Sequence, residues 1–410
     1  MKYKFPVINH ISDLLPAIEG DTNFIVAEKD GYTVVTYNLS TPEAFPPIKV
    51  AGGSAKMRAE RSLHNALRRE CRGIIFCSET GKILRRPYHK FFNVGEKQEN
   101  SNLNLTEEHV LLEKLDGSML VPFYLNGKVV WGTKAGLTPV AEPVQAYVNR
   151  NPKYQEFVTQ VLAAGYSPIF EWCSRIQKIV LDYPEDRLIL TAIRDIVDGH
   201  YAHYSVMQAF SEEFDIPVVQ KFDSMKDIKD LVAHTRDLQD LEGYVIRFDD
   251  GHMAKLKCDW YCTIHKALEG LYFEKDVIEM IMKDNVDDIK AIIPIDRVNA
   301  LEEYASELTK NVYAKIDEIY DSGMVSYIKA HEEANFDEKE TKKQYALKVK
   351  DRKGSSIYFK LFDIIKNEKG SDVYPMFKDH VFAYVIGCCS SQSKVDSMRW
   401  LIGERKWEYV

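Results

Sequence analysis

The stretch EKLDGS at residues 113–118 determines how the rest of the chain is interpreted. It lies between two apolar runs, 110–112 and 119–121, so we expect a turn bounded by two strands. If the strand geometry continues through the stretch, Lys114 and Asp116 point to one face and into one cleft. A lysine beside a carboxylate and other charges can serve as a nucleophile. The alternative is a surface turn with an ordinary Lys–Asp pair, because K-x-D-G alone is a short motif.

Composition limits the classes of protein. The chain has 410 residues, 45% hydrophobic and 28% charged, which predicts a globular protein of two or three domains. Its net charge of −8 excludes a protein that simply coats nucleic acid, so any polyanion must bind in a local basic cleft. We expect neither secretion nor membrane insertion, because the N-terminus lacks an apolar signal core and no apolar run approaches membrane-spanning length. Seven cysteines, an odd number, favour free thiols in a reducing cytoplasm.

Up to about residue 270 the sequence alternates strands and helices. Segments 24–28 and 33–37 flank Asp30-Gly31, and two strands within 119–135 meet at Asn126-Gly127, both typical of hairpins. Helical spacing predicts helices at 11–18, 56–69, 143–164, 205–210 and 226–234. This part is therefore predicted to be α+β.

Beyond about residue 270 hairpin patterns disappear and glycine becomes sparse. Helices are expected at 274–283, 297–320, 338–352, 357–365 and 394–404. We therefore predict an α+β domain over 1–270, with an N-terminal subregion of about 1–100, followed by an all-α C-terminal domain over 271–410.

Charged side chains recur beside the predicted strand ends. They are Arg72, Lys90, Lys114, Asp116, Lys134, Glu171, Glu242, Lys255 and Lys257. So many cations in one cluster require an anion among them. Lys255 and Lys257 share one strand face and form a plausible phosphate clamp, although lysines also protect edge strands. A nucleophilic lysine, phosphate ligands and carboxylates for Mg²⁺ or ribose are the groups that nucleotidyl transfer uses.

Four short motifs in order carry a family resemblance. KLDG at 114–117, FEW at 170–172, EGYV at 242–245 and KLK at 255–257 resemble motifs I, III, IV and V of covalent nucleotidyltransferases. That superfamily includes ATP-dependent DNA and RNA ligases and mRNA capping enzymes. Within it, the chain is most similar to the T4-like RNA ligase 1 family over roughly residues 30–265. The supporting stretches are 70–74, 89–93, 113–118, 133–134 and 183–194.

Two features separate the chain from other branches. DNA ligases usually carry an arginine five residues after the lysine, where this chain has Met119, and no OB-type domain or motif VI follows Lys257. The resemblance implies a nucleotidyltransferase domain (an ATP-grasp-like ligase domain) of antiparallel sheets and helices. The activity it implies is that of an ATP-dependent RNA ligase that seals 5′-phosphate and 3′-hydroxyl ends.

The resemblance also implies catalytic roles. Lys114 attacks the α-phosphorus of ATP, expels pyrophosphate and forms a lysyl-AMP adduct. Lys255 and Lys257 hold the α-phosphate, and Glu171 binds the ribose. Tyr37 stands where the family has a functional tyrosine.

The remaining site residues hold the triphosphate tail and the metal. Arg72, Lys90 and Lys134 are implied to bind the β- and γ-phosphates. Asp116 and Glu242 are implied to position Mg²⁺, the lysine or the RNA ends, with Mn²⁺ able to substitute for Mg²⁺. AMP then passes to an RNA 5′-phosphate, and a 3′-hydroxyl displaces it.

The implied partners are ATP and RNA, in particular a broken tRNA in tRNA repair. The chain is expected to be a bacteriophage-like enzyme that works as a monomer in the cytoplasm, or in the host cytoplasm if it is viral, and that does not bind a membrane. A polynucleotide kinase-phosphatase is expected to act upstream of it. The helical domain would select the RNA. Segment 339–353 holds seven basic residues, and Tyr345 and Tyr358 beside it are expected to stack on bases, although charge runs are usually solvated helix faces. The alternatives are a capping guanylyltransferase, a DNA ligase, or a non-catalytic RNA-binding protein on the same scaffold.

Overall fold

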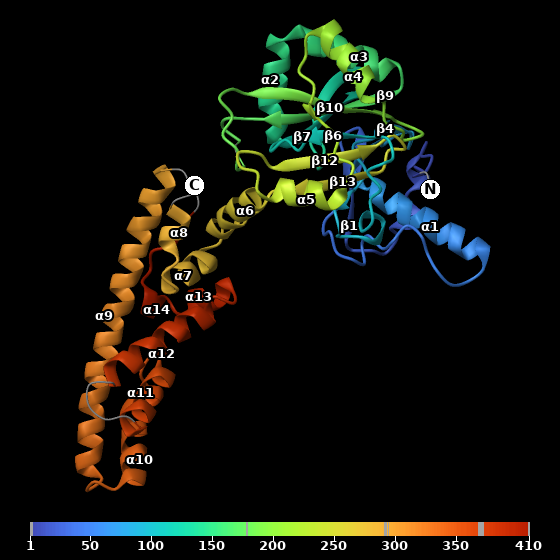
Figure 1. Ribbon diagram of the computed structural model, residues 1–410. Coiled ribbons are helices and arrows are strands. Elements are labelled where there is room, and N and C mark those ends of the chain that lie inside the picture. The colour runs from blue at the N-terminus through green and yellow to red at the C-terminus, as the bar shows by residue number, and fades with distance from the viewer. Residues whose placement is uncertain (1–2, 178, 291–292, 294, 368–372, 409–410) are drawn as a thin grey trace. The chain divides into compact units, whose positions relative to one another are not determined.

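A computed structural model describes residues 3–177, 179–290, 293, 295–367 and 373–408. The chain divides into two compact units, Met1–Thr263 and Ile264–Val410 (Figure 1). The division falls inside α6 (Asp259–Leu271), slightly before the boundary expected after residue 270. The first unit contains helices and sheets whose named strands pair antiparallel apart from β13 with β5, and the described residues of the second unit form helices without strands, so the predicted fold class is confirmed.

The described residues of the first unit form three sheets. The N-terminal sheet has the order β1-β2-β3-β4, with bounds Phe24–Lys29, Tyr32–Tyr37, Arg72–Cys77 and Ile83–Arg85. The second has the order β10-β9-β7-β8, with bounds Arg187–Asp195, Tyr166–Cys173, Ser118–Leu125 and Lys128–Gly132. The third has the order β11-β6-β12-β13-β5, with bounds Lys221–Phe222, His109–Glu113, Gly243–Phe248, Met253–Lys257 and Phe92–Asn93. Both hairpins expected from Asp-Gly and Asn-Gly turns are present, as β1–β2 and β7–β8.

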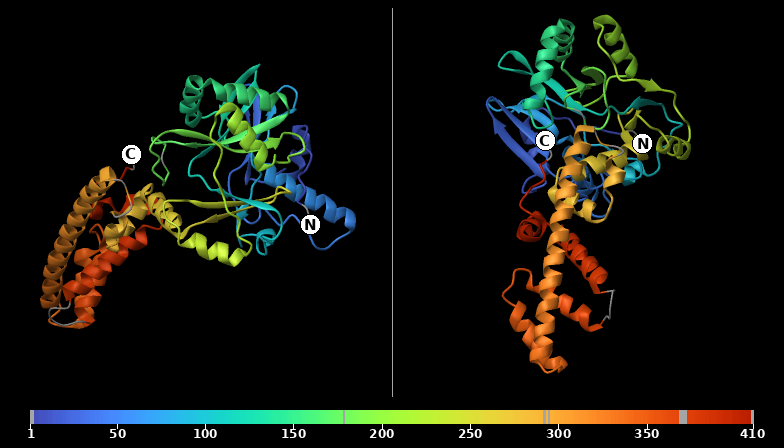
Figure 2. Two further views of the ribbon diagram at one scale, coloured as in Figure 1. Left: turned by 45° about the horizontal axis from the view of Figure 1, so that its top comes forward. Right: turned by 90° about the vertical axis from the view of Figure 1, so that its left-hand side faces the viewer.

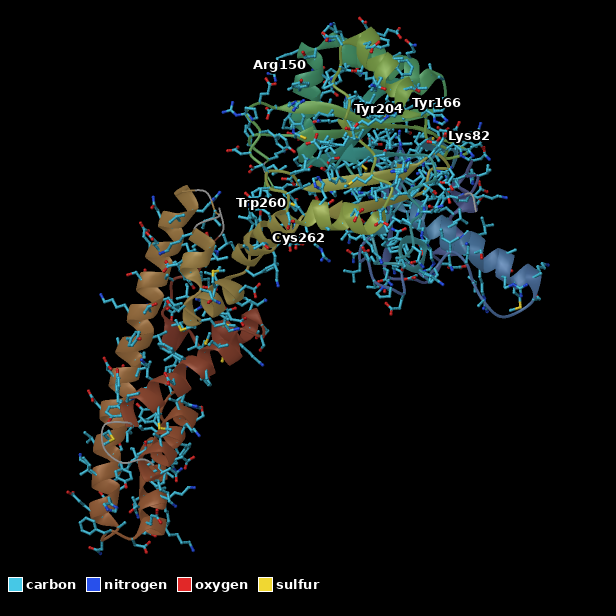
Figure 3. All side chains as sticks on the ribbon, viewed as in Figure 1. Lys82, Arg150, Tyr166, Tyr204, Trp260 and Cys262 are labelled. Atoms are coloured by element: carbon cyan, nitrogen blue, oxygen red, sulfur yellow. The ribbon has the colours of Figure 1, made fainter. Side chains whose placement is uncertain are left out.

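The second and third sheets share one apolar core. Leu112 and Val245 of the third sheet pack with Leu120, Phe170 and Leu190 of the second. Helices cover the outer faces of these sheets (Figure 1). They are α2 (Glu142–Arg150), α3 (Pro152–Ala163) and α4 (Tyr204–Phe214) beside the second sheet, and α5 (Ile228–Arg236) beside the third. Tyr166 and Tyr204 mark the starts of β9 and α4 (Figure 3).

Two helix predictions in this unit were wrong in detail. Residues 11–18 form two short 3₁₀ turns, Ile11–Asp13 and Leu15–Ala17, instead of one helix. Segment 143–164 divides into α2 and α3 at Pro152, because proline lacks the N–H that would continue the first helix. The helix α1 (Ala55–Glu70) agrees with the expected one, and Ser54 caps it by accepting a hydrogen bond from the Met57 amide.

The second unit is a helical assembly around one hydrophobic core. Its further helices are α7 (Glu274–Met282), α8 (Val286–Lys290), α9 (Ile295–Glu333), α10 (Glu338–Val349), α11 (Ser355–Asn367), α12 (Val373–Cys388), α13 (Gln392–Ser397) and α14 (Arg399–Ile402). Helices α10, α11 and α12 lie alongside the long α9 (Figure 2). The sequence pattern missed α12, and the single helix expected over 394–404 is two. Among the described residues, no helix is both long and apolar enough to cross a membrane.

The predicted stacking tyrosines of this unit are part of its core. Tyr345 and Tyr358 are only 1% and 5% exposed, and the Tyr345 hydroxyl donates a hydrogen bond to the Tyr358 carbonyl oxygen at 2.9 Å. The prediction that they stack on RNA bases is therefore wrong. Some of the neighbouring basic residues are also paired, Lys343 with Glu340 and Lys348 with a glutamate on α9.

Candidate active site

The site is organised around the loop that leaves β6. Lys114 follows that strand directly, and its amide donates a hydrogen bond to the Gly243 carbonyl oxygen at 2.9 Å. Its Nζ lies 2.6 Å from Glu242 Oε1, and Lys257 Nζ lies 2.9 Å from the same oxygen. Pairing of β12 with both β6 and β13 explains this arrangement, because Tyr244 stands opposite Glu113 and Gly243 opposite Lys257. Glu242 is thus a buried carboxylate shared by two lysines.

A cavity of about 250 Å³ lies between the second and third sheets. Its walls include predicted site residues from six separate segments of the chain: Tyr37, Arg72, Lys90, Lys114, Glu171 and Lys255. Glu242 and Lys257 join this group through their contacts with Lys114. The fold therefore brings together side chains that lie far apart in the sequence.

The cavity carries excess positive charge without enough anions to balance it. Burial and the nearby Arg72 lower the pKa of Lys90 to about 8. Burial and the charges of Lys90 and Lys114 also lower the pKa of Lys255 to about 8. Arg72 stacks over the Phe91 ring at 5.6 Å, and its buried Nε has no hydrogen-bond partner among the described residues. Orphaned donors and repelling cations are the features expected of a site for a polyanion.

Glu171 introduces a carboxyl group into this cationic cavity. It stands on β9 opposite Met119 of β7. Burial raises its pKa to about 7; Lys114 opposes the shift and Glu242 adds to it. A carboxyl group with this pKa can exchange a proton near neutral pH and can accept hydrogen bonds from hydroxyl groups.

Tyr37 contacts two of the predicted cations, Lys134 and Lys90. Lys134 Nζ donates a hydrogen bond to the Tyr37 carbonyl oxygen at 3.2 Å and lies 3.7 Å from the ring centroid. Lys90 Nζ lies 4.8 Å from the same ring centroid. The ring therefore holds both ammonium groups by cation–π contact. Burial lowers the pKa of Lys134, and the charges of Arg72 and Lys90 contribute to the shift.

Asp116 occupies a different place from the one expected. It lies in the loop between β6 and β7, not in a strand, and it does not line the cavity with Lys114. Its Oδ2 accepts hydrogen bonds from the amides of Val180 and Leu181 at 2.8 and 2.7 Å, and its Oδ1 accepts one from the Tyr261 hydroxyl at 2.7 Å. Three donors thus satisfy a carboxylate that is 3% exposed. The geometry supports Asp116 as a residue that fixes the loop.

Two motif glycines are required by close packing. A Cβ on Gly117 would stand 2.4 Å from the Trp172 carbonyl oxygen. Gly243 has φ +139°, and a Cβ there would stand 2.0 Å from the Leu256 carbonyl oxygen. These glycines let the Lys114 loop approach β9 and let β12 approach β13.

The residues present do not form a metal site by themselves. Among the described residues no group of three or more His, Cys, Asp or Glu side chains is arranged to hold an ion. The two predicted metal ligands have other partners: Glu242 pairs with lysines, and Asp116 is satisfied by hydrogen bonds. A divalent cation used here would be bound chiefly by substrate phosphates.

Sequence reasoning missed several residues of the site. Arg247 and Phe91 line the cavity, and Tyr183 accepts a hydrogen bond from the Asp116 amide at 3.1 Å. Strand alternation places Arg247 on the same face as Val245, a pattern that could have identified it. Tyr261 lies beyond the recognised motifs, and only tertiary contacts identify it.

Comparisons with known proteins find sequences similar to this chain. Residues 70–261 match the family described as RNA ligase. The chain is 28% identical over 309 residues to a putative RNA ligase of Thermovibrio ammonificans, an alignment that covers 73% of this chain and 76% of that protein. It is also 28% identical over 280 residues to RNA ligase 1 of bacteriophage TS2126, covering 63% of this chain and 62% of that protein.

The alignment with a solved structure of an archaeal ATP-dependent RNA ligase covers 76% of this chain and 79% of that chain, with 13% identity and a TM-score of 0.43. The sequence matches show what the chain resembles: residues 70–261 match the RNA ligase family, and over most of its length the chain is similar to proteins described as RNA ligases.

Proposed function

We propose that the chain seals RNA ends through a lysyl-AMP intermediate on Lys114. The observation that carries the proposal is the position of Lys114: its Nζ contacts Glu242 at one end of a cavity whose walls hold Arg72, Lys90 and Lys255. A triphosphate with its α-phosphorus at Lys114 would meet these cations along its length. The arrangement neutralises charge where it develops, which is how phosphoryl transfer is catalysed.

The first step is an in-line displacement at the α-phosphorus of ATP. The Lys114 ammonium group first gives up one proton, and the neutral amine then forms the P–N bond while the bond to the bridging oxygen of the β-phosphate breaks. Pyrophosphate leaves, and the nitrogen releases a second proton to solvent. Lys255 and Lys257 are proposed to hold the α-phosphate, and Glu171 the ribose. Arg72, Lys90 and Lys134 are proposed to hold the β- and γ-phosphates and so to orient the leaving group.

The second and third steps use RNA. A 5′-phosphate attacks the adduct and takes AMP, which regenerates the lysine, and a 3′-hydroxyl then attacks the activated 5′-phosphate and releases AMP. Mg²⁺ is the proposed divalent cation, with Mn²⁺ able to replace it; its charge would offset that of the phosphates.

The proposed physiological substrate is a broken tRNA, acted on by a cytoplasmic monomer. Ends that carry a 5′-hydroxyl or a blocked 3′ phosphate must first be converted, so a kinase-phosphatase would act upstream. We assign residues 1–270 to adenylation and sealing, and the helical segment 271–410 to RNA selection.

Sealing assays test these assignments. The purified chain is incubated with Mg²⁺, ATP and a stem-loop RNA cut in its loop, which carries a 5′-phosphate and a 3′-hydroxyl. The expected products are the sealed loop and, early in the reaction, an adenylated 5′ end. GTP use would favour a capping guanylyltransferase, preference for the matched DNA would favour a DNA ligase, and RNA binding without sealing would favour a non-catalytic protein. Deleting residues 275–410 is expected to leave sealing of simple RNA partly intact and to reduce the preference for the cut stem-loop.

A further inference from the structure

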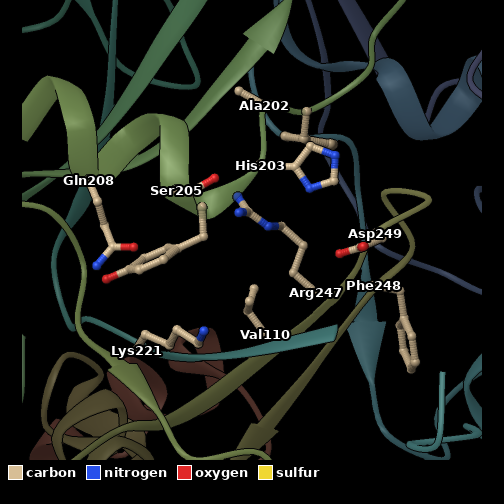
Figure 4. Close-up of a pocket in the computed structure, with 11 residues that line it drawn as sticks. Val110, Ala202, His203, Ser205, Gln208, Lys221, Arg247, Phe248 and Asp249 are labelled. Atoms are coloured by element: carbon tan, nitrogen blue, oxygen red, sulfur yellow. The ribbon is translucent and has the colours of Figure 1, made fainter. Parts of the chain in front are cut away.

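A second cavity, distinct from the one around Lys114, lies near the other end of the third sheet (Figure 4). Its volume is about 210 Å³, and its walls come from β6, β11, β12 and the start of α4. Arg247 lines both cavities. It lies in β12, five residues after Glu242, which directly precedes that strand. That spacing corresponds to roughly 16 Å along an extended strand. The chemistry proposed for Lys114 gives this second cavity no role.

Arg247 is a buried cation that forms no ion pair with any described residue. Its side chain is 4% exposed, and its hydrogen bond within the described residues goes from Nη1 to the thioether sulfur of Met207 at 3.8 Å. Figure 4 shows the guanidinium group pointing into the cavity, toward Ser205 at the start of α4. Burial lowers the pKa of Arg247, so the charged group is kept there at a cost. An oxyanion in the cavity would offset that cost.

The start of α4 supplies further donors to the same space. The backbone of His203, which precedes the helix, is extended, and its side chain makes no capping hydrogen bond. The first amides of a helix carry the positive end of its dipole. The Val206 amide donates to the His203 carbonyl oxygen at 3.1 Å, so the amides of Tyr204 and Ser205 are the first ones of α4 that can serve the cavity. Tyr204 and Ser205 line the cavity at this point, and the Ser205 hydroxyl adds one more donor.

A second cation completes the wall. Lys221 of β11 lines the cavity, and its Nζ lies 5.8 Å from the centroid of the Tyr204 ring. Asp249, an exposed carboxylate, also borders the cavity and opposes anion binding. Two cations and a helix N-terminus against one solvated carboxylate leave a net preference for an anion.

We propose that this cavity is a second phosphate-binding site, in which Arg247, Lys221, the Ser205 hydroxyl and the first amides of α4 hold one phosphate group. The cavity is large enough for a single tetrahedral oxyanion with its hydrogen-bonding shell. The phosphate belongs either to the backbone of a bound RNA strand or to a free phosphate ion. The proposal does not depend on the ligase chemistry at Lys114.

A signal from Ser205 itself tests the proposal on the full chain. Protein labelled with ¹⁵N-serine is titrated with inorganic phosphate, and the Ser205 amide resonance is assigned by its loss in Ser205→Ala. The resonance is expected to shift and saturate. Lys221→Gln should weaken this binding by at least about tenfold, because a charge-assisted contact is lost. Lys229→Gln, which removes an exposed lysine of α5 outside the cavity, is the matched control and should leave the affinity unchanged.

A short RNA with a 5′-hydroxyl separates the two sources, because its only phosphates are backbone phosphodiesters. If this RNA shifts the Ser205 resonance and phosphate competes with it, the site reads the RNA backbone, and Lys221→Gln should reduce the salt dependence of RNA binding by about one ion. If only inorganic phosphate shifts the resonance, the ligand is the free ion. The proposal is overturned if neither titration moves the resonance, or if Lys221→Gln binds phosphate as tightly as the unmodified chain.

Discussion

Lys114 Nζ lies 2.6 Å from Glu242 Oε1, the oxygen that also pairs with Lys257. One buried carboxylate therefore sets the distance between the proposed nucleophile and a proposed phosphate ligand. The β12–β13 pairing fixes this arrangement, because Gly243 stands directly opposite Lys257. Position and charge are thus both specified by the backbone of one hairpin.

Replacing the shared carboxylate should misplace both lysines. Glu242→Gln keeps the side-chain shape but removes the charge that holds the two ammonium groups. We expect transfer of AMP to the protein to slow by about 10²-fold, since small displacements in such sites cost that much. Rates of labelling from ATP under single-turnover conditions measure the effect. Labelling at the unmodified rate in a folded variant would show that the contact has no part in positioning.

The pKa of Glu171 predicts a pH-dependent stability. Burial raises that pKa to about 7, so the folded chain retains a proton that the unfolded chain releases near pH 4.5. The protonated Glu171 side chain therefore contributes fully to the free energy of unfolding below pH 4.5, and this contribution is lost as the pH rises through about 7. Glu171→Gln should therefore be more stable than the unmodified chain by roughly 1–2 kcal/mol at pH 8, after allowance for solvent screening, and about equal near pH 4.5.

Chemical unfolding at the two pH values checks this prediction. Glu108→Gln, which changes an exposed carboxylate in the same unit, serves as the control and should alter neither value. A constant difference between Glu171→Gln and the unmodified chain at both pH values would contradict the assigned pKa shift.

Nucleotide binding should take up protons at pH 8. Lys90 and Lys255 have pKa values of about 8, so each is partly neutral there, and a triphosphate between them favours the charged forms. With the unmodified chain and an ATP analogue whose α,β-bridging oxygen is replaced by a methylene group, which blocks the chemical step, we expect uptake of about one proton at pH 8 and much less at pH 6. Calorimetry in buffers with different ionisation enthalpies measures it. Lys255→Met should roughly halve the uptake at pH 8, whereas proton release at that pH would be inconsistent with a cationic triphosphate site.

The hydrogen bonds of Asp116 predict a loss of stability when it is replaced. Asp116→Ala removes the acceptor of a buried amide, a partly buried amide and the Tyr261 hydroxyl, at a cost of about 3–5 kcal/mol. Tyr261→Phe should cost about 1–2 kcal/mol, and the double variant should cost less than the sum. Denaturant unfolding of the four proteins without metal measures these values. If Asp116→Ala were as stable as the unmodified chain, the residue would not have the structural role assigned to it.

The sequence predicted much of the fold because local geometry dominates there. Hairpins at Asp30-Gly31 and Asn126-Gly127 follow from turn chemistry, and both formed as expected. The change from sheets to helices was visible in the sequence because glycine becomes sparse and hairpin patterns disappear beyond about residue 270. Helix α12 was missed because its own apolar and aromatic residues are spread around the helix and leave no clear polar face. Helical periodicity therefore does not mark this segment.

The candidate site was predictable to the extent that motifs marked it. Motif order identified Lys114, Glu171, Glu242, Lys255 and Lys257, and the fold brings them to one region. Asp116 was misplaced because the alternation rule assumed a strand where the chain forms a loop. The stacking role of Tyr345 failed for a related reason, since helical spacing alone did not reveal that its face was buried.

The most direct test of the central claim is covalent labelling by ATP that carries a radioactive α-phosphate. The purified chain and Lys114→Ala are incubated with this ATP and Mg²⁺, then denatured, and bound label is measured with pyrophosphate release. We predict an acid-labile, alkali-stable adduct on Lys114 and no adduct in Lys114→Ala, which stays folded because Glu242 retains its contact with Lys257. Label of equal extent in Lys114→Ala, or no label in folded protein that is not already adenylated, would contradict the account.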